Sequence, residues 1–236
     1  RSLVIVSIQD MADENRRKVL ERTFFHDVMN AAGGAMGIAN MLAEADSMDE
    51  VKEFAPLLVF VTEQLVAEID SQRDMLAAER GELNVQKEDF GTVQLLMEVL
   101  GTYANHPVAE ERRLELDPVA SDHLIHTSKT LLHRVLGNMV KNALEATATG
   151  GTVRLGCNHI IGEFCFWVNN PEVMSQATQL QVFNRSFSTK GAGRGIGTYS
   201  IRLLGERYLG GRVSFDSTET EGTTFRIHLP AAPRDK

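Results

Sequence analysis

The stretch from 182 to 209, VFNRSFSTKGAGRGIGTYSIRLLGERYL, constrains the fold of this chain more than any other. It contains four glycines at alternate positions, Gly191, Gly193, Gly195 and Gly197. A backbone this rich in glycine can approach a phosphate closely, and the free N–H groups at the start of the following helix favour an anion. Lys190 and Arg194 add positive charge at the same place. A lone glycine cluster is more often an ordinary loop, so the prediction of a phosphate-binding loop needs a second motif.

The composition limits the classes of partner. The chain has 236 residues, 43% of them apolar, which suits one or two globular domains with a sizeable core. A net charge of −8 argues against nucleic acid as the main partner. No run of about 18 apolar residues occurs, so we expect no membrane contact within these residues. Cys157 and Cys165 lack metal-site spacing and favour a reducing compartment, so we expect a cytoplasmic location.

Two long helical patterns fill the first third of the chain. Residues 1–9 favour a short strand, and apolar residues then recur at three- and four-residue steps over 10–45 and again over about 51–80. Between the two patterns, Ser47 and Glu50 have the spacing of a capping box. One helical hairpin cannot bury both of its apolar stripes. We therefore expect two chains to pair as a dimeric four-helix bundle.

The pattern changes at 81–86, which we take as the domain boundary. We expect a helix over 89–106, strands in RRLELDP and DHLIHTS, and a helix that begins after Ser128 and ends before Gly150. Further strands are predicted at 152–157, 164–168, 212–216 and 224–229. Helices and strands mixed in this way indicate an α/β sandwich, and the chain as a whole is predicted to be α+β.

A second polar motif interrupts an apolar helix face in HRVLGNMVKNALEAT, residues 133–147. Asn138 and Asn142 are four residues apart and therefore share one face. Their amide oxygens can hold a hydrated Mg²⁺ beside phosphates. An isolated pair with this spacing is more often solvated. Mid-helix asparagines, however, are unfavourable by roughly 0.5 kcal/mol each, so two of them on an apolar face need a reason.

With both motifs in view, the chain resembles the sensor histidine kinases of two-component systems. Residues 138–142 resemble their N-box, and 193–197 resemble their second glycine box. Residues 182–187 resemble the lid segment with its phenylalanine, and GTTF at 222–225 resembles the closing strand motif of this ATPase fold. The resemblance implies a GHKL-type domain over 83–236, an α/β sandwich with a Bergerat-type ATP site.

The resemblance also implies the ligands and the residues that bind them. ATP and Mg²⁺ are the expected ligands, with Asn142 as the main Mg²⁺ ligand and Lys190 near the phosphates. The other nucleotide-binding residues that it implies are Asn138, Asn170, Phe183, Gly193, Arg194, Gly195, Gly197 and Thr223.

One family motif is altered in this chain. The aspartate–glycine box of the family, DxGxG, corresponds here to FWVNNPEVM at 166–174. Asn170 takes the place of the aspartate that accepts a hydrogen bond from the adenine amino group, and the box glycines are absent. An alternative function therefore stays open, a nucleotide-sensing, phosphatase-biased or catalytically weak scaffold.

The first helical pattern contains FHDVMN at 25–30, which resembles the phospho-acceptor box of the family. His26 and Asn30 lie one turn apart on one face. A neutral imidazole nitrogen is a nucleophile toward a γ-phosphoryl group, and Asp27 can take the proton from the other ring nitrogen. Asn30 can orient a water for attack on a phosphorylated regulator. We therefore expect residues 11–82 to be a dimerisation and phosphotransfer hairpin of an ATP-dependent protein-histidine kinase, which passes the phosphoryl group to an aspartate of a response regulator.

Two further segments point to partners. Gly33, Gly34 and Gly37 continue the helix face beyond Asn30, and they favour equally a local kink or a smooth surface for a receiver domain. Residues 1–10 resemble the end of a PAS-like sensor domain, so we expect a sensor domain upstream. An ATPase of the chaperone or topoisomerase type with the same fold is a third hypothesis, which HDxxN on a dimerising hairpin disfavours.

Overall fold

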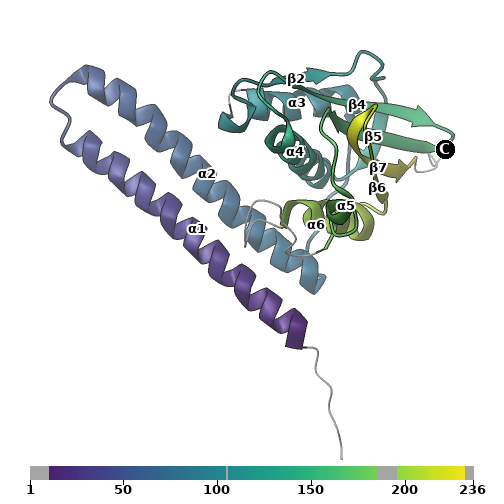
Figure 1. The fold of residues 1–236 in the computed structure, drawn as a ribbon, viewed down its shortest axis with the longest axis horizontal. Coiled ribbons are helices and arrows are strands. Elements are labelled where there is room, and N and C mark those ends of the chain that lie inside the picture. Colours follow the sequence, from purple (N-terminus) through teal and green to yellow (C-terminus); the bar gives the residue numbers. More distant parts are fainter. Residues whose placement is uncertain (1–10, 105, 185–195, 232–236) are drawn as a thin grey trace, which may run out of the picture. The chain divides into compact units, whose positions relative to one another are not determined.

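The computed structural model describes residues 11–104, 106–184 and 196–231 (Figure 1). These residues form two compact units, a helical hairpin and a mixed α/β domain. The division falls after Ala77. The strand predicted at 1–9 and the PAS-like segment at 1–10 lie outside the described residues. So do four of the predicted nucleotide-binding residues, Lys190, Gly193, Arg194 and Gly195.

The first unit is built from α1 (Met11–Ala43) and α2 (Met48–Arg80). The predicted capping box is confirmed at the start of α2. The Glu50 N–H donates to Ser47 Oγ at 3.2 Å, and the Glu50 carboxylate accepts from the Asp46 N–H at 3.0 Å. Apolar side chains remain exposed on both helices, among them Phe25, Met29, Met36, Val59 and Val66. A lone hairpin leaves these side chains in water, and the dimeric four-helix bundle stays a prediction.

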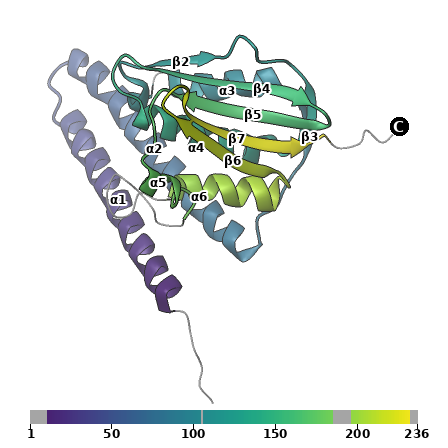
Figure 2. The ribbon, with the colours of Figure 1, turned by 45° about the vertical axis from the view of Figure 1, so that its right-hand side comes forward.

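The second unit is an α/β sandwich (Figure 2). Its five-stranded sheet has the order β2-β4-β5-β7-β6. The strands are β2 (Arg113–Leu116), β4 (Thr152–Ile160), β5 (Glu163–Asn170), β6 (Arg212–Thr218) and β7 (Gly222–Pro230). β2 pairs in parallel with β4, and the other neighbours are antiparallel. The predicted strands are thus confirmed, several of them longer than predicted.

Helices cover one face of this sheet and supply the other half of the core. They are α3 (Thr92–Ala104), α4 (Lys129–Ala146) and α6 (Ile196–Arg202), the last continued by the π-helical turn η2 (Leu203–Tyr208). The short helices η1 (Pro107–Ala109) and α5 (Gln176–Gln179) lie in connections. The core consists of the apolar faces of α3 and α4 and alternate residues of the sheet, such as Leu95, Leu132, Leu136, Met139, Leu155, Phe166 and Ile227. Ser128 precedes α4 as predicted, although its side chain makes no capping hydrogen bond.

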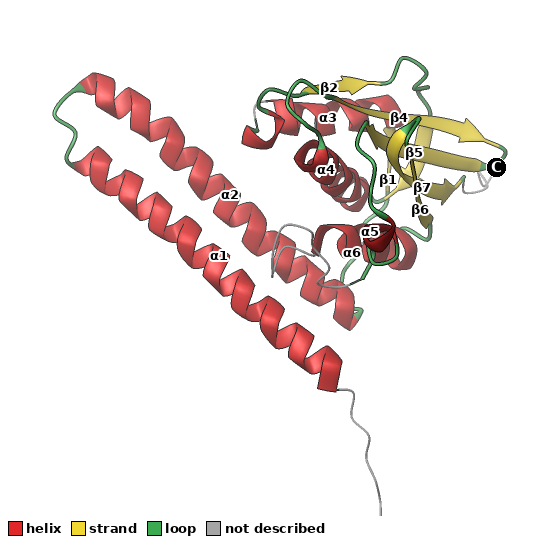
Figure 3. Ribbon diagram, in the orientation of Figure 1, coloured by secondary structure: helices red, strands yellow, loops and turns green. Residues whose placement is uncertain are grey.

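The helix predicted over 89–106 is wrong at its start (Figure 3). Residues Glu88–Gly91 form β1, which pairs antiparallel with β3 (Leu124–Thr127), and α3 begins only at Thr92. Phe90 is buried opposite Ile125 in this pair, and the Thr92 N–H donates to the carbonyl of His123 at 2.9 Å. A partner strand more than 30 residues away overrides the local helical pattern.

Candidate nucleotide-binding site

The two asparagines of α4 face the start of α6. Asn138 Nδ2 donates to Ser200 Oγ at 3.4 Å. A Cβ on Gly197 would lie 3.2 Å from Asn142 Oδ1 and 3.3 Å from its Nδ2. The first turn of α6 therefore lies directly against the Asn142 amide, and the absence of a side chain at Gly197 leaves the space that this amide occupies.

Asn142 leaves a polar group unpaired inside the domain. Its Nδ2 atom is buried and has no hydrogen-bond partner among the described residues. An unsatisfied buried donor costs about 1–3 kcal/mol. The amide fits a polar ligand, because its N–H groups can donate to phosphate oxygens and its oxygen is a type that Mg²⁺ prefers. Within the described part of the chain, no group of three or more His, Cys, Asp or Glu side chains is arranged to hold a metal.

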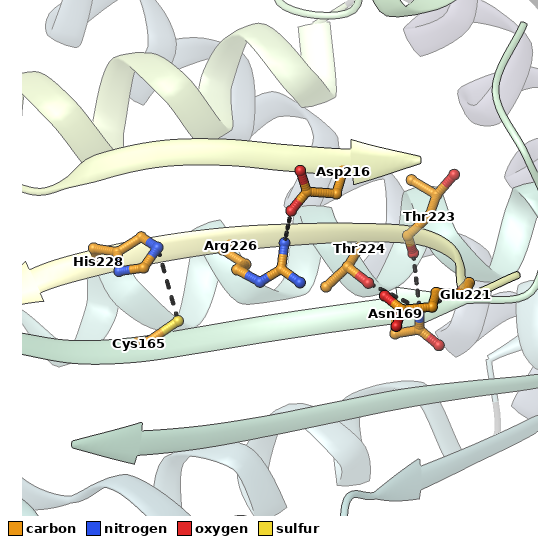
Figure 4. A network of polar contacts seen from close by, with 8 residues as sticks. All are labelled: Cys165, Asn169, Asp216, Glu221, Thr223, Thr224, Arg226 and His228. Atoms are coloured by element: carbon orange, nitrogen blue, oxygen red, sulfur yellow. Dashed lines mark hydrogen bonds and ion pairs between the residues drawn. The ribbon is translucent and has the colours of Figure 1, made fainter. Parts of the chain in front are cut away.

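Asn170 is the second buried amide with an unpaired nitrogen. It ends β5, only 4% of it is exposed, and its Nδ2 also lacks a partner among the described residues. The side chain of the neighbouring Asn169 points to the other face of the sheet, and its amide nitrogen is hydrogen-bonded. Its Nδ2 donates to the Glu221 carbonyl at 2.9 Å, the Thr223 carbonyl at 3.3 Å and Thr224 Oγ1 at 2.9 Å (Figure 4). The two adjacent asparagines therefore differ: one holds the turn into β7, and the other has donor capacity for a ligand.

The turn into β7 brings Thr223 opposite Asn170. Gly222 adopts a φ of 70°, in the left-handed region that favours glycine. A Cβ at this position would lie only 2.1 Å from the Asn170 carbonyl oxygen. Gly222 thus allows β7 to pair closely with the end of β5, and this pairing sets Thr223 in register with Asn170.

Hydroxyl groups hold the loop that follows β5, where the family has glycines. Thr223 Oγ1 donates to the Glu172 carbonyl at 2.7 Å. This bond uses the only hydroxyl proton of Thr223, so the Ser217 hydroxyl donates to Thr223 Oγ1 across 2.8 Å. Ser217 Oγ in turn accepts from the Met174 N–H at 2.9 Å. Thr223 is predicted to bind the nucleotide, whereas the sequence motifs do not predict the roles of Asn169 and Ser217. The available signal was the run of hydroxyl residues on the two strands that flank this turn.

Phe183 is the second residue of the predicted lid segment, and its ring packs against the sheet. Its ring centroid lies 5.6 Å from that of Phe215 and 6.0 Å from that of Phe225, both in edge-on geometry. The guanidinium of Arg202 lies 5.5 Å from the Phe183 ring centroid, and its Nε donates to Glu206 at 3.1 Å. Stacking and cation–π contacts of this kind are favourable. The anchor ties the start of the lid to β6, β7 and α6.

The predicted phosphotransfer residues lie in α1. His26, Asp27 and Asn30 occupy helical positions there, and the Asn30 side chain is exposed. The side chains of His26 and Asp27 are outside the described part. α1 continues through all three glycines of the predicted receiver surface, and a Cβ on any of Gly33, Gly34 or Gly37 would meet nothing within 4 Å.

Comparison with known proteins identifies an ATPase domain in part of the chain. Residues 127–233 match the model of histidine kinase-, DNA gyrase B- and HSP90-like ATPases. The chain is 24% identical over 229 residues to the autoinducer 2 sensor kinase/phosphatase LuxQ of Vibrio parahaemolyticus, across 89% of this chain. It is 26% identical over 197 residues to the sensor protein DivL of Caulobacter vibrioides, across 83% of this chain. The matched residues thus belong to a histidine kinase-like ATPase domain, and the chain as a whole is similar to sensor kinases. It spans about a quarter of the length of these relatives, 26% in both cases.

Solved structures share the fold of this chain. The histidine kinase AdeS of Acinetobacter baumannii matches with a TM-score of 0.62 at 14% identity, covering 88% of this chain and 98% of AdeS. The catalytic domain of the histidine kinase ThkA matches with a TM-score of 0.56 at 22% identity, covering 62% of this chain and 96% of that domain. The α+β class and the GHKL-type ATP-binding domain are thus confirmed. Across the described helices, none is long and apolar enough to cross a membrane.

Proposed function

We propose that this chain is the core of a sensor histidine kinase that binds Mg-ATP, autophosphorylates His26 and transfers the phosphoryl group to an aspartate of a response regulator. The buried, unpaired amide nitrogens of Asn142 and Asn170 carry the nucleotide part of this proposal. Relatives named sensor kinase/phosphatase support it, and they also support a phosphatase activity toward the same regulator. A solved complex of ThkA with the response regulator TrrA covers 98% of this chain with a TM-score of 0.56 at 20% identity.

Different residues of the proposed site would bind different parts of the nucleotide. The Asn142 oxygen would hold Mg²⁺, which neutralises phosphate charge when bound, and Asn170 would face the base. The phosphates would lie against Asn138 and the start of α6, with the residues of the glycine-rich segment, Lys190, Gly193, Arg194, Gly195 and Gly197, around them. Phe183 anchors the start of the lid that would cover the nucleotide.

The hairpin would supply the acceptor. An imidazole nitrogen of His26 attacks the γ-phosphorus, the bond to the bridging oxygen breaks, and ADP leaves. Asp27 takes the proton from the other ring nitrogen. The exposed apolar side chains of α1 and α2 support a homodimer. The open helix surface at Gly33, Gly34 and Gly37 supports docking of a receiver domain. An upstream sensor domain and a cytoplasmic location belong to the same proposal.

Incubation with γ-labelled ATP and Mg²⁺ tests the kinase. We expect a label that acid removes and base does not, as for phosphohistidine. His26→Gln should abolish the label and leave nucleotide binding nearly intact, whereas His159→Gln, at an exposed position of the sandwich, should keep it. A label that persists on the His26 variant would contradict the assignment and direct the search to His123, His126 and His133.

The second candidate is a nucleotide-sensing or phosphatase-biased scaffold. The altered box favours it, because Asn170 replaces the aspartate and the box glycines are absent. Calorimetric titration with Mg-ADP, combined with the labelling assay, separates the two candidates. Nucleotide binding without histidine labelling would support the scaffold.

A further inference from the structure

We propose that Asn170 lets this site accept GTP as well as ATP, so that it selects purine nucleotides rather than adenine nucleotides alone. The inference rests on the proposed function, which sets Asn170 against the edge of the base that carries the substituent at position 6. It goes beyond that function, because it makes Asn170 the residue that determines which nucleotide the site takes.

No described group holds the amide nitrogen of Asn170 in place. The nitrogen is buried without a partner at the end of β5, where only 4% of the residue is exposed. Its partner in the strand pair is Thr223. The Thr223 hydroxyl donates its hydrogen bond to the Glu172 carbonyl and accepts one from Ser217, so it has no hydrogen left to orient the amide. A half-turn of the amide exchanges its nitrogen and oxygen at little cost in protein hydrogen bonds. Asn169 shows the contrast, since three acceptors fix its nitrogen.

The free rotation of the Asn170 amide is important because adenine and guanine present different hydrogen-bonding groups. Adenine presents an amino donor at position 6 and an acceptor at N1, whereas guanine presents an oxygen acceptor at position 6 and a donor at N1. An amide carries one acceptor and one donor side by side, so it can pair with both atoms of either base after a half-turn. A carboxylate only accepts, and it would meet the guanine oxygen with its own lone pairs. The aspartate of the family therefore favours adenine, and the asparagine here removes that preference.

The size of the effect follows from the bonds involved. Both pairings with the amide are neutral and of similar strength, so we expect the affinities for the two purine nucleotides to agree within roughly tenfold. A pyrimidine is too small to reach the same amide from the same ribose position. It leaves the buried group unpaired, and its binding should be weaker by about tenfold or more.

The test is calorimetric titration of the whole chain with Mg-ADP, Mg-GDP and Mg-CDP, which avoids any dependence on catalysis. We expect ADP and GDP to bind within roughly tenfold of each other and CDP to bind more weakly. Asn170→Asp should tighten ADP binding several-fold and weaken GDP binding by roughly tenfold, which moves the two affinities in opposite directions. Asn169→Asp is the matched control on the opposite face. It should lower thermal stability, because a carboxylate cannot donate to the three acceptors, and it should leave the ratio of ADP to GDP affinity unchanged.

The outcomes separate this inference from the proposed function. GDP binding more than about a hundredfold weaker than ADP binding in the unaltered chain would overturn the inference and leave the kinase proposal standing. Equal shifts of both affinities in Asn170→Asp would overturn it too. If neither nucleotide binds, both the inference and the proposed nucleotide-binding site are contradicted. If both bind and His26 is not labelled with either triphosphate, the inference stands and the kinase proposal fails.

Discussion

Gly197 and Asn142 meet at the start of α6, and one added methyl group tests their contact. In Gly197→Ala the new Cβ would lie 3.2 Å from Asn142 Oδ1 and would displace the amide by a few tenths of an ångström. Alanine is more favourable than glycine inside a helix by about 1 kcal/mol, so the folded stability should hold or rise. The affinity for Mg-ADP should nevertheless fall several-fold. Thermal unfolding and calorimetric titration measure the two effects separately.

Gly101→Ala is the matched control for this prediction. Gly101 is an exposed position of α3, and a Cβ there would meet nothing within 4 Å. This variant should gain up to about 1 kcal/mol of stability and keep its nucleotide affinity. Unaltered Mg-ADP binding by Gly197→Ala would remove Asn142 from the site.

Asp27 and Asn30 are predicted to serve different reactions. Asp27→Asn should slow autophosphorylation by about a hundredfold or more, because the base is lost. Asn30→Ala should spare autophosphorylation and weaken dephosphorylation of the regulator, because the water is no longer oriented. Assays of label uptake and of phosphoregulator decay measure the two reactions. Equal loss of both in each variant would contradict this division.

At the scale of the elements, the loop after β5 depends on the hydroxyl of Thr223. Thr223→Val keeps the shape of the side chain and removes the donor to the Glu172 carbonyl and the acceptor for Ser217. We expect the free energy of unfolding of the sandwich to fall by about 1–3 kcal/mol, because buried polar groups lose their partners. Nucleotide affinity should fall as well, since Asn170 lies opposite in the same strand pair.

Denaturant titration measures the effect of Thr223→Val, with Thr220→Val as the matched control. Thr220→Val changes an exposed threonine of the same β6–β7 turn. It should alter the free energy of unfolding by less than about 0.5 kcal/mol. A similar small change in Thr223→Val would show that the hydroxyl network does not hold the loop.

At the scale of the whole ATP-binding domain, three histidines make stability depend on pH. Burial lowers the pKa of His106, His133 and His228 below the ordinary histidine value. Just below about pH 6.5 the unfolded chain therefore binds more protons than the folded one, and stability rises with pH in that window. We expect a lower denaturation midpoint at about pH 5.5 than at about pH 7.5. His133→Gln should reduce the difference. A midpoint that is higher at the acidic pH would contradict this account.

The sequence by itself determined the periodic and short-range features of this protein. Alternation of apolar residues predicted the strands of the sheet, and three- and four-residue steps predicted α1, α2 and α4. The capping box at Ser47 and Glu50 could be predicted because its partners are three residues apart. The shared helix face of Asn138 and Asn142 could be predicted for the same reason, because it is local geometry, and the glycine-rich segment resembled a motif of the ATPase family.

Only the tertiary structure decided which of these polar groups are left without partners. β1 forms instead of a longer α3 because Phe90 pairs across to Ile125, a residue of a distant strand. The loop after β5 is held by Thr223, 51 residues along the chain, and by Ser217, 43 residues along. The unpaired nitrogens of Asn142 and Asn170, and the contact of Gly197 with the first of them, depend on how α4, β5 and α6 pack. Packing and strand register bring distant residues into contact. The spacing of residues along the chain does not predict which of them these will be.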